Sequence, residues 1–185
     1  LSRALIGRIR GGLAQVNVLV SMFFAGMNGS VVADTATVGA LVLPAMKKAG
    51  YPAAFSAAVT GVSSTIGGII PPSIMMIVLA NATEISIAAL FAAGIIPGIL
   101  IGVVIMVINH YFAVKYNFER SDQPFSVRRA GKELYRSSFA LLIPLVLVGS
   151  VMGGVASVVE AGAITALVAL FTGVFVYRTI KWKDC

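Results

Sequence analysis

Residues 26–79 read GMNGSVVADTATVGALVLPAMKKAGYPAAFSAAVTGVSSTIGGIIPPSIMMIVL, and polar turns interrupt this otherwise apolar stretch twice. The first interruption is Asn28-Gly29-Ser30, which Asp34 follows, and the second runs from Gly67 to Ser73 through Pro71-Pro72. Non-helical backbone is tolerated at membrane depth only where it packs in protein or lines a polar cavity. Two interrupted helices of this kind therefore predict a binding site inside a membrane protein.

The composition is that of an integral membrane protein. The 185 residues are 58% hydrophobic and 11% charged, and the mean hydropathy of +0.97 exceeds what one soluble core can bury. The net charge of +7 does not indicate nucleic-acid binding, because the basic residues lie between apolar segments and form no stripe with aromatic residues. The single cysteine, Cys185, excludes an intrachain disulfide, and no Cys/His cluster has metal-ligand spacing.

Polar interruptions divide the chain into predicted segments. An interfacial amphipathic segment covers 1–11, a re-entrant helical hairpin 12–48 and a discontinuous transmembrane helix 53–80. A transmembrane helix over 85–115 precedes a cytoplasmic linker over 116–137 and two more transmembrane helices, 138–156 and 160–178. Leu1 is not preceded by a start methionine or signal peptide, and the sequence stops soon after an apolar span, so we expect a partial chain.

The first hairpin is open to two interpretations. It forms either two short spans joined at the far surface or a re-entrant hairpin whose tip stops within the membrane. Each arm covers roughly 24 Å at about 1.5 Å per residue, less than a ~30 Å hydrocarbon core. The tip has no aromatic anchor and no charge before Asp34, which favours the re-entrant form.

The positions of charged residues predict the orientation. All 14 Lys and Arg residues lie at 3–10, 47–48, 115–136 or 178–183, and the predicted topology puts every one of these groups on the same face. By the positive-inside rule that face is cytoplasmic, whereas the other face carries Glu84 and Glu160. Two full spans in place of the hairpin would leave all the basic groups on the same face of the membrane.

The first interruption has residues suited to an ion site. Gly29 allows a tight turn, and Ser30 can cap the second arm, whose free N–H groups then point into the same place as the last carbonyls of the first arm. Such carbonyl oxygens suit Na⁺. Asp34 is either a first-turn acid that the helix dipole stabilises or, as an ionisable residue in the membrane, a functional one.

Hydroxyl side chains precede the second interruption. They belong to Thr60, Ser63, Ser64 and Thr65, and with the unpaired carbonyls before the prolines they can replace the water shell of a dehydrated ion. For any single hydroxyl the alternative is a bond back to its own helix. Near the end of the chain, Ser157-Val158-Val159-Glu160 predicts a capping box.

At these residues the chain resembles the large membrane subunit of the tripartite ATP-independent periplasmic (TRAP) transporters. The matching residues, in chain order, are Gly11-Gly12-Leu13-Ala14, Gly29-Ser30 with Ala33-Asp34, Pro44 to Tyr51, Ile70 to Ile74, Leu90-Phe91 with Ala93-Gly94-Ile95 and Pro97-Gly98, and Glu160-Ala161 with Ala163.

The resemblance implies an all-α polytopic membrane protein of the ion-transporter-superfamily (elevator) fold, with the first inverted repeat and the start of the second. It further implies sodium-coupled import of organic acids, of the C4-dicarboxylate or sialic-acid type, across the bacterial inner membrane. Na⁺ is then the coupling ion, and no other cofactor is expected. The expected partners are a small TRAP membrane subunit, a periplasmic substrate-binding protein, the organic acid and the lipid bilayer, but no nucleic acid.

The resemblance also places the sites, with no catalytic residue among them. It assigns the sodium site to Gly29, Ser30, Thr65, Gly68 and Pro71. It assigns the substrate cavity to Asn28, Ser30, Asp34, Ser64, Pro72 and Ser73. The family usually has Thr-Pro-Thr-Glu at 157–160 and often Ser at 28, and its second hairpin and second Pro-Pro break do not occur in this sequence.

Two other functions compete with transport. An intramembrane serine protease could use Ser30 as nucleophile and His110 as base, but we expect Ser30 deep in the membrane and His110 at the cytoplasmic interface. The third possibility is a truncated membrane scaffold that does not transport.

Overall fold

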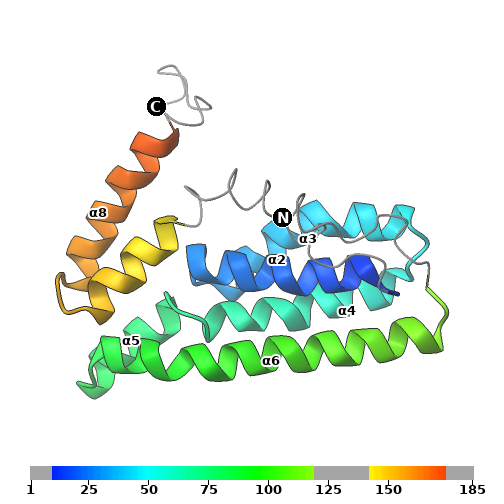
Figure 1. Cartoon of the computed structure of the whole chain (residues 1–185), viewed down its shortest axis with the longest axis horizontal. Helices are drawn as coiled ribbons and strands as arrows, with labels where there is room; N and C mark the ends of the chain where they lie inside the picture. Colours follow the sequence, from blue (N-terminus) through cyan, green and yellow to red (C-terminus); the bar gives the residue numbers. More distant parts are fainter. Residues whose placement is uncertain (1–9, 119–141, 174–185) are drawn as a thin grey trace, which may run out of the picture.

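A computed structural model describes residues 10–118 and 142–173, and all the elements assigned in these ranges are helices (Figure 1). They are α2 (Gly12–Asn28), α3 (Val31–Lys48), α4 (Ala53–Ser64), the 3₁₀ turn η1 (Thr65–Gly68), α5 (Ile74–Thr83), α6 (Ile87–Lys115), the helix Leu142–Met152 and α8 (Val158–Phe171). The chain is therefore all-α in its described part. Most of the predicted interfacial segment and of the predicted linker lies outside the described residues.

Helices α2 and α3 form an antiparallel hairpin, and α4 and α6 pack along it (Figure 1). The hairpin has arms of 17 and 18 residues, or about 26 Å each at about 1.5 Å per residue, which is shorter than a hydrocarbon core. Among the described helices only α6, with 29 residues and a mean hydropathy of 2.7, is long and apolar enough to cross a membrane. The re-entrant position of the hairpin stays a prediction.

A glycine turn and a serine cap separate the two C-terminal helices. The helix described from Leu142 onward ends at Met152, before the end of the predicted span at residue 156, because the chain turns at Gly153-Gly154 with φ +67° at Gly154. Helix α8 begins at Val158 because Ser157 caps it. The capping box is confirmed: Ser157 Oγ accepts from the Glu160 N–H, and the Glu160 carboxylate accepts from the Ser157 N–H at 2.8 Å.

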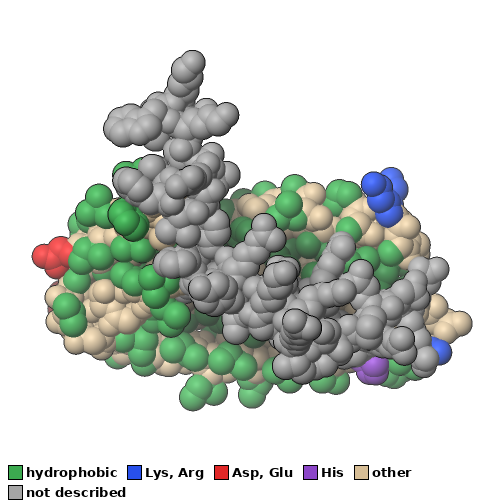
Figure 2. Space-filling model, turned by 45° about the horizontal axis from the view of Figure 1, so that its top comes forward, with side chains coloured by type: hydrophobic (Ala, Val, Ile, Leu, Met, Phe, Trp, Pro, Cys, Tyr) green, Lys and Arg blue, Asp and Glu red, His purple; other side chains and the backbone are tan. Residues whose placement is uncertain are grey.

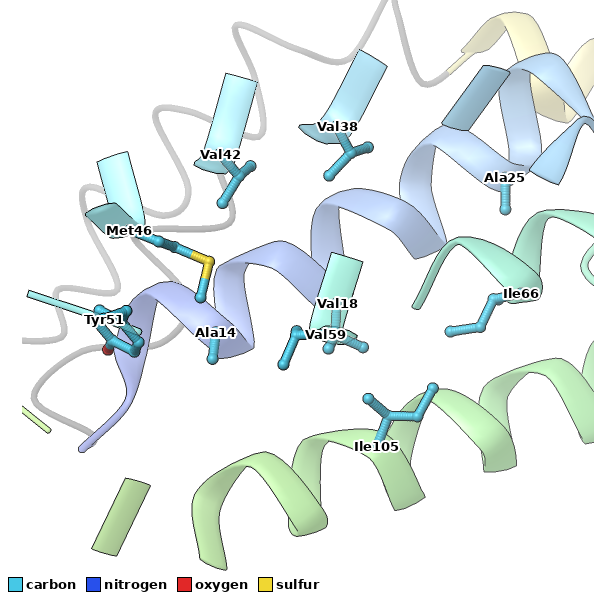
Figure 3. Packing of buried hydrophobic residues seen from close by; sticks show 10 residues of the cluster. All are labelled: Ala14, Val18, Ala25, Val38, Val42, Met46, Tyr51, Val59, Ile66 and Ile105. Carbon is cyan, nitrogen blue, oxygen red and sulfur yellow. The ribbon is translucent and has the colours of Figure 1, made fainter. Parts of the chain in front are cut away.

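The main core lies between the hairpin, α4, η1 and α6 (Figure 3). Most of its buried side chains are alanine, valine or isoleucine, which lets the helices approach closely. They are Ala14, Val18, Ala25, Val38, Val42, Met46, Tyr51, Val59, Ile66 and Ile105. A second cluster of Phe91, Val151 and Ala161 joins the start of α6 to the C-terminal helices.

Aromatic rings hold together the end of the molecule where α3 ends, α4 begins and α6 ends. The ring of Phe118 lies 4.8 Å from that of Tyr51 and 5.0 Å from that of Phe55, between centroids. Phe55 also meets Phe112 edge-on at 6.2 Å. Ring pairs at these centroid distances, tilted or edge-on and not stacked face to face, are favourable. The cluster fixes the base of the hairpin to the end of α6.

Apart from the buried Asp34, the described charges lie toward the two ends of the molecule. Arg10, Lys47, Lys48 and Lys115 lie where α2 begins and where α3 and α6 end. Glu84 follows α5, and Glu160 lies in the first turn of α8. Figure 2 shows basic side chains at one end of the visible face and an acidic side chain at the other. This is the separation that the sequence predicts for these residues.

Glycines on α6 let the interrupted segment between α4 and α5 lie directly against this helix. A Cβ on Gly94 would overlap the carbonyl oxygen of Ile69, and one on Gly98 would overlap the side chain of Ile70. One turn further, a Cβ on Gly102 would come within 2.6 Å of the Met22 sulfur. These glycines recur every four residues, so they line one face of α6.

We predict that Gly94→Ala destabilises the protein by about 1–3 kcal/mol, the usual cost of overpacking a close contact. The backbone of Ile69 must move to admit the methyl group. Gly61→Ala is the matched control, since its Cβ meets nothing within 4 Å and alanine favours the helix. Thermal unfolding of the full-length protein in detergent measures both, and equal melting temperatures would contradict this account of α6.

Candidate functional site

The tip of the hairpin is a tight turn between two helix ends. Helix α2 ends at Asn28, Gly29 adopts φ +59° and Ser30 is extended. The Ser30 hydroxyl accepts the Ala33 N–H at 3.4 Å, which confirms Ser30 as the N-cap of α3. The Asn28 side-chain oxygen accepts the Ser30 N–H at 3.2 Å. The sequence-predicted turn thus places the C-terminus of one helix beside the N-terminus of the next.

The second interruption separates α4 from α5. The chain passes from η1, which ends at Gly68, through non-helical residues 69–73 with a cis Pro71–Pro72 bond, and re-enters a helix at Ile74. Ser73 ties the two sides together: its hydroxyl donates to the Gly68 carbonyl at 2.8 Å and accepts the Met76 N–H at 3.4 Å. Ser73 is therefore the N-cap of α5.

The two interruptions contact each other. The Ile74 N–H donates to the Gly29 carbonyl oxygen at 3.2 Å, and a Cβ on Gly29 would overlap the Pro72 carbonyl oxygen. On the other side of the tip, a Cβ on Gly67 would lie 3.7 Å from the Ser30 carbonyl. Backbone from two distant parts of the sequence therefore meets here, and at Gly29 it leaves no room for a side chain.

The residues predicted to hold Na⁺ take different positions around this contact. The hairpin tip itself consists of Gly29 and Ser30. Gly68 also lies at the contact, because it packs beside Val31 at the start of α3. Pro71 lies beside Gly26. The Thr65 hydroxyl instead donates to the Val62 carbonyl at 2.7 Å, and Thr65 is exposed.

The residues predicted to line a substrate cavity differ in burial. Asn28 and Ser30 are partly exposed at the tip. Asp34, Ser64 and Ser73 are fully buried, and Pro72 is buried against Gly29. A groove of about 470 Å³ lies elsewhere, between the α5–α6 turn and the start of α8, and none of the predicted site residues lines it.

Three of the four hydroxyls before the break bond to their own helix. Thr60 donates to the Ser56 carbonyl, Ser63 to the Thr60 carbonyl and Thr65 to the Val62 carbonyl. The alternative of a bond back to the helix is thus confirmed for them. Ser64 differs, because its buried hydroxyl has no hydrogen-bond partner among the described residues.

Sequence reasoning missed polar residues on α2 that face α4. The Asn17 amide donates to Thr60 Oγ1 at 2.7 Å, and the Ser21 and Ser63 hydroxyls lie 3.0 Å apart. Asn17 and Ser21 are fully buried. The detectable signal was their spacing, since Asn17, Ser21 and Asn28 recur at intervals of four and seven residues and share one face of an apolar helix.

Asp34 is the charged residue at the centre of these elements. It is fully buried, and the hydroxyls of Ser21 and Ser64 neighbour its carboxylate. Neither carboxylate oxygen receives a hydrogen bond in good geometry from the described residues. The helix dipole at the start of α3 contributes a favourable potential, but a buried carboxylate also needs donors or a counter-charge.

The geometry does not support a serine nucleophile with a histidine base. Ser30 lies at the hairpin tip, whereas His110 is near the C-terminal end of α6 with Lys115, at the basic end of the molecule (Figure 2). The Ser30 hydroxyl is occupied as a helix cap.

Comparison with known proteins gives one consistent family. The family model described as "Tripartite ATP-independent periplasmic transporter, DctM component" matches residues 1–185. The C4-dicarboxylate TRAP transporter large permease protein DctM of Pseudomonas aeruginosa is 36% identical over 100% of this chain and 43% of its own length. The sialic acid TRAP transporter large permease protein SiaM of Vibrio cholerae is 35% identical over 97% of this chain and 42% of its own length.

A third relative, the isethionate TRAP transporter permease protein DctMQ of Oleidesulfovibrio alaskensis, is 32% identical over 100% of this chain. This chain covers 30% of that relative's length. The chain thus spans less than half the length of the relatives it matches.

We predict that Gly29→Ala separates the hairpin tip from the α4–α5 break. The new methyl group would overlap the Pro72 carbonyl oxygen, and the Ile74 N–H would lose its partner. Amide hydrogen exchange of the peptide around Ile74 should become faster. Gly50→Ala is the matched control, because Gly50 also has a positive φ, +78°, but open space around its Cβ. Equal exchange in the two variants would contradict the contact.

Proposed function

Because this chain belongs to the DctM component family of the tripartite ATP-independent periplasmic transporters, we propose that it forms part of a permease for sodium-coupled import of organic acids. The family is one of transporters and not of enzymes. The observation that carries the finer proposal is the contact between the hairpin tip and the α4–α5 break, with the buried Asp34 beside it.

The contact offers the two kinds of group that such a transporter needs. Carbonyl oxygens of the helix ends at Gly29 and Gly68 are hard ligands that suit Na⁺. The N-termini of α3 and α5, capped by Ser30 and Ser73, present backbone N–H groups and a positive dipole end, which suit the carboxylate of an organic acid. An anionic substrate and a cation bound side by side stabilise each other, and this mutual stabilisation is the basis of coupling.

Asp34 adds the negative charge that a cation site requires. A fully buried carboxylate that receives no hydrogen bond in good geometry from the described residues is unfavourable as an isolated charge. A sodium ion between Asp34 and the hydroxyls of Ser21 and Ser64 compensates that charge. We therefore extend the proposed sodium site from the hairpin tip to these three side chains.

The relatives define the proposed substrate class and partners. They are named as TRAP permeases for C4-dicarboxylate and for sialic acid, which are organic acids. We propose a substrate of this class, delivered by a periplasmic substrate-binding protein, and a small membrane subunit beside the permease in the bacterial inner membrane. The positive-inside rule orients the end with Arg10, Lys47, Lys48 and Lys115 toward the cytoplasm.

Uptake by the full-length protein with its partners in proteoliposomes tests the function. We expect import of the organic acid to require a Na⁺ gradient and to stop when K⁺ replaces Na⁺. Asp34→Asn should raise the Na⁺ concentration for half-maximal uptake at least about tenfold, equivalent to about 1.4 kcal/mol, because the amide removes the counter-charge. Glu84→Gln, at the exposed end of α5, is the control. Uptake indifferent to Na⁺ would refute the proposal.

A second prediction separates the site from simple helix capping. Ser30 and Ser86 both cap a helix through a hydroxyl that accepts an N–H at 3.4 Å. Either Ser→Ala change costs about 1 kcal/mol of helix stability, but only Ser30 lies at the tip contact. Ser30→Ala should weaken Na⁺ dependence of uptake whereas Ser86→Ala should leave it unchanged. The same Na⁺ response in both variants would remove Ser30 from the site.

A further inference from the structure

The groove of about 470 Å³ between the α5–α6 turn and the start of α8 lies at the acidic end of the molecule, and we name it the acidic-end groove. Figure 1 shows both turns at this end. The polar residues of its lining are Asn81, Glu84 and Ser157, and the other lining residues are alanine, isoleucine or valine. No residue of the proposed sodium or substrate site lines the groove, so a ligand held here is a separate one.

The interior of the acidic-end groove is apolar. Its buried lining residues are Ala80 and Val151, and Val151 belongs to the second core cluster. Ile87 and Ala88, which also line the groove, pack against that cluster. An apolar chain in the groove would therefore extend an existing core, and the hydrophobic effect favours such burial.

Glu84 gives the mouth of the groove an acid that is free to bind. Its side chain is exposed and has no hydrogen-bond or ion-pair partner among the described residues. Its backbone has φ +57°, a left-handed conformation that glycine adopts without strain and glutamate does not. Glu160 differs, because its carboxylate already accepts the Ser157 N–H at 2.8 Å. A strained acid with a free carboxylate beside a groove favours a role in binding a cationic group.

The surroundings of the groove are suited to a bilayer. Val155 and Val159 are each 83% exposed, and Ile85, which lines the groove, is 50% exposed. Exposed aliphatic side chains close to one another are unfavourable in water and mark a membrane or protein contact. The caps Ser86 and Ser157 begin α6 and α8 at this level. The boundary between polar and apolar surroundings therefore crosses the groove, which suits an amphiphilic ligand better than a soluble protein.

We propose that the acidic-end groove binds a phospholipid with a primary-amine headgroup, of the phosphatidylethanolamine type. The headgroup ammonium donates hydrogen bonds to the Glu84 carboxylate, and an acyl chain lies on Val151. A choline headgroup has no N–H to donate, so it loses the charge-assisted hydrogen bond. A phosphatidylglycerol headgroup places net negative charge beside Glu84 and Glu160, which repel it. The proposal uses the groove alone and does not depend on the sodium site.

Lipid binding to the delipidated full-length protein in detergent tests the proposal. Native mass spectrometry would measure the Kd for phosphatidylethanolamine, phosphatidylcholine and phosphatidylglycerol with identical acyl chains. We expect phosphatidylethanolamine to bind at least about tenfold tighter than either of the others, because only its headgroup makes a charge-assisted hydrogen bond to the carboxylate. Equal affinities, or the tightest binding for phosphatidylglycerol, would overturn the proposal.

Two variants locate the lipid. Glu84→Gln should raise the Kd for phosphatidylethanolamine to that for phosphatidylcholine, because the amide carries no charge. Ala88→Phe should raise the Kd for all three lipids by filling the groove. Ala89→Phe is the matched control, since Ala89 is the next residue of α6, is exposed and does not line the groove. An unchanged lipid preference in Glu84→Gln, or equal effects of the two phenylalanines, would place the lipid elsewhere and refute the site.

A protein partner in the groove would give a different result. Ala88→Phe would then weaken binding of the periplasmic substrate-binding protein to the permease and leave the lipid affinities unchanged, and this outcome would also refute the lipid site. The sodium dependence of uptake is measured separately, in proteoliposomes. Failure of the lipid site and failure of the proposed function are therefore distinguishable.

Discussion

The hydrogen bond from the Ile74 N–H to the Gly29 carbonyl oxygen is the constraint on which the rest of the structure depends. Each interrupted helix exposes backbone donors or acceptors that an apolar environment cannot satisfy. Here the first N–H of α5, that of Ile74, pairs with the carbonyl oxygen of Gly29 in the hairpin tip. This requires backbones to approach within hydrogen-bonding distance, and only a residue without a Cβ fits at position 29, where the Pro72 carbonyl occupies the space.

The remaining elements hold that contact in place from two directions. Glycines 94 and 98 of α6 allow the Ile69–Ile70 backbone to lie directly on the helix, so the break is supported from behind. At the other end, Phe118 joins Tyr51 and Phe55 and ties the hairpin base to α6. A short hairpin supported at both ends can present polar groups at its tip without losing its position.

Much of the architecture could be predicted from local sequence signals. Gly29-Ser30 indicated a turn and a cap, Pro71-Pro72 indicated a break, and Ser157 with Glu160 indicated a capping box, because these signals act within one or two helical turns. The direction of a side chain was less accessible. Thr65 and Ser64 were both predicted to face a site, yet the Thr65 hydroxyl bonds to its own helix whereas Ser64 is buried beside Asp34. Asn17 and Ser21 were missed because their partners on α4 lie more than 40 residues away.

By itself the sequence determined the membrane character, the order of the helical segments, the sites of interruption and the charge asymmetry, since all of these follow from local hydropathy, backbone chemistry and capping. The tertiary structure alone decided that the two interruptions meet and which hydroxyls face Asp34. It also decided that Asn17 and Ser21 on α2 pair with Thr60 and Ser63 on α4. The reason is physical: helix packing brings together side chains whose relation the linear order of residues does not record.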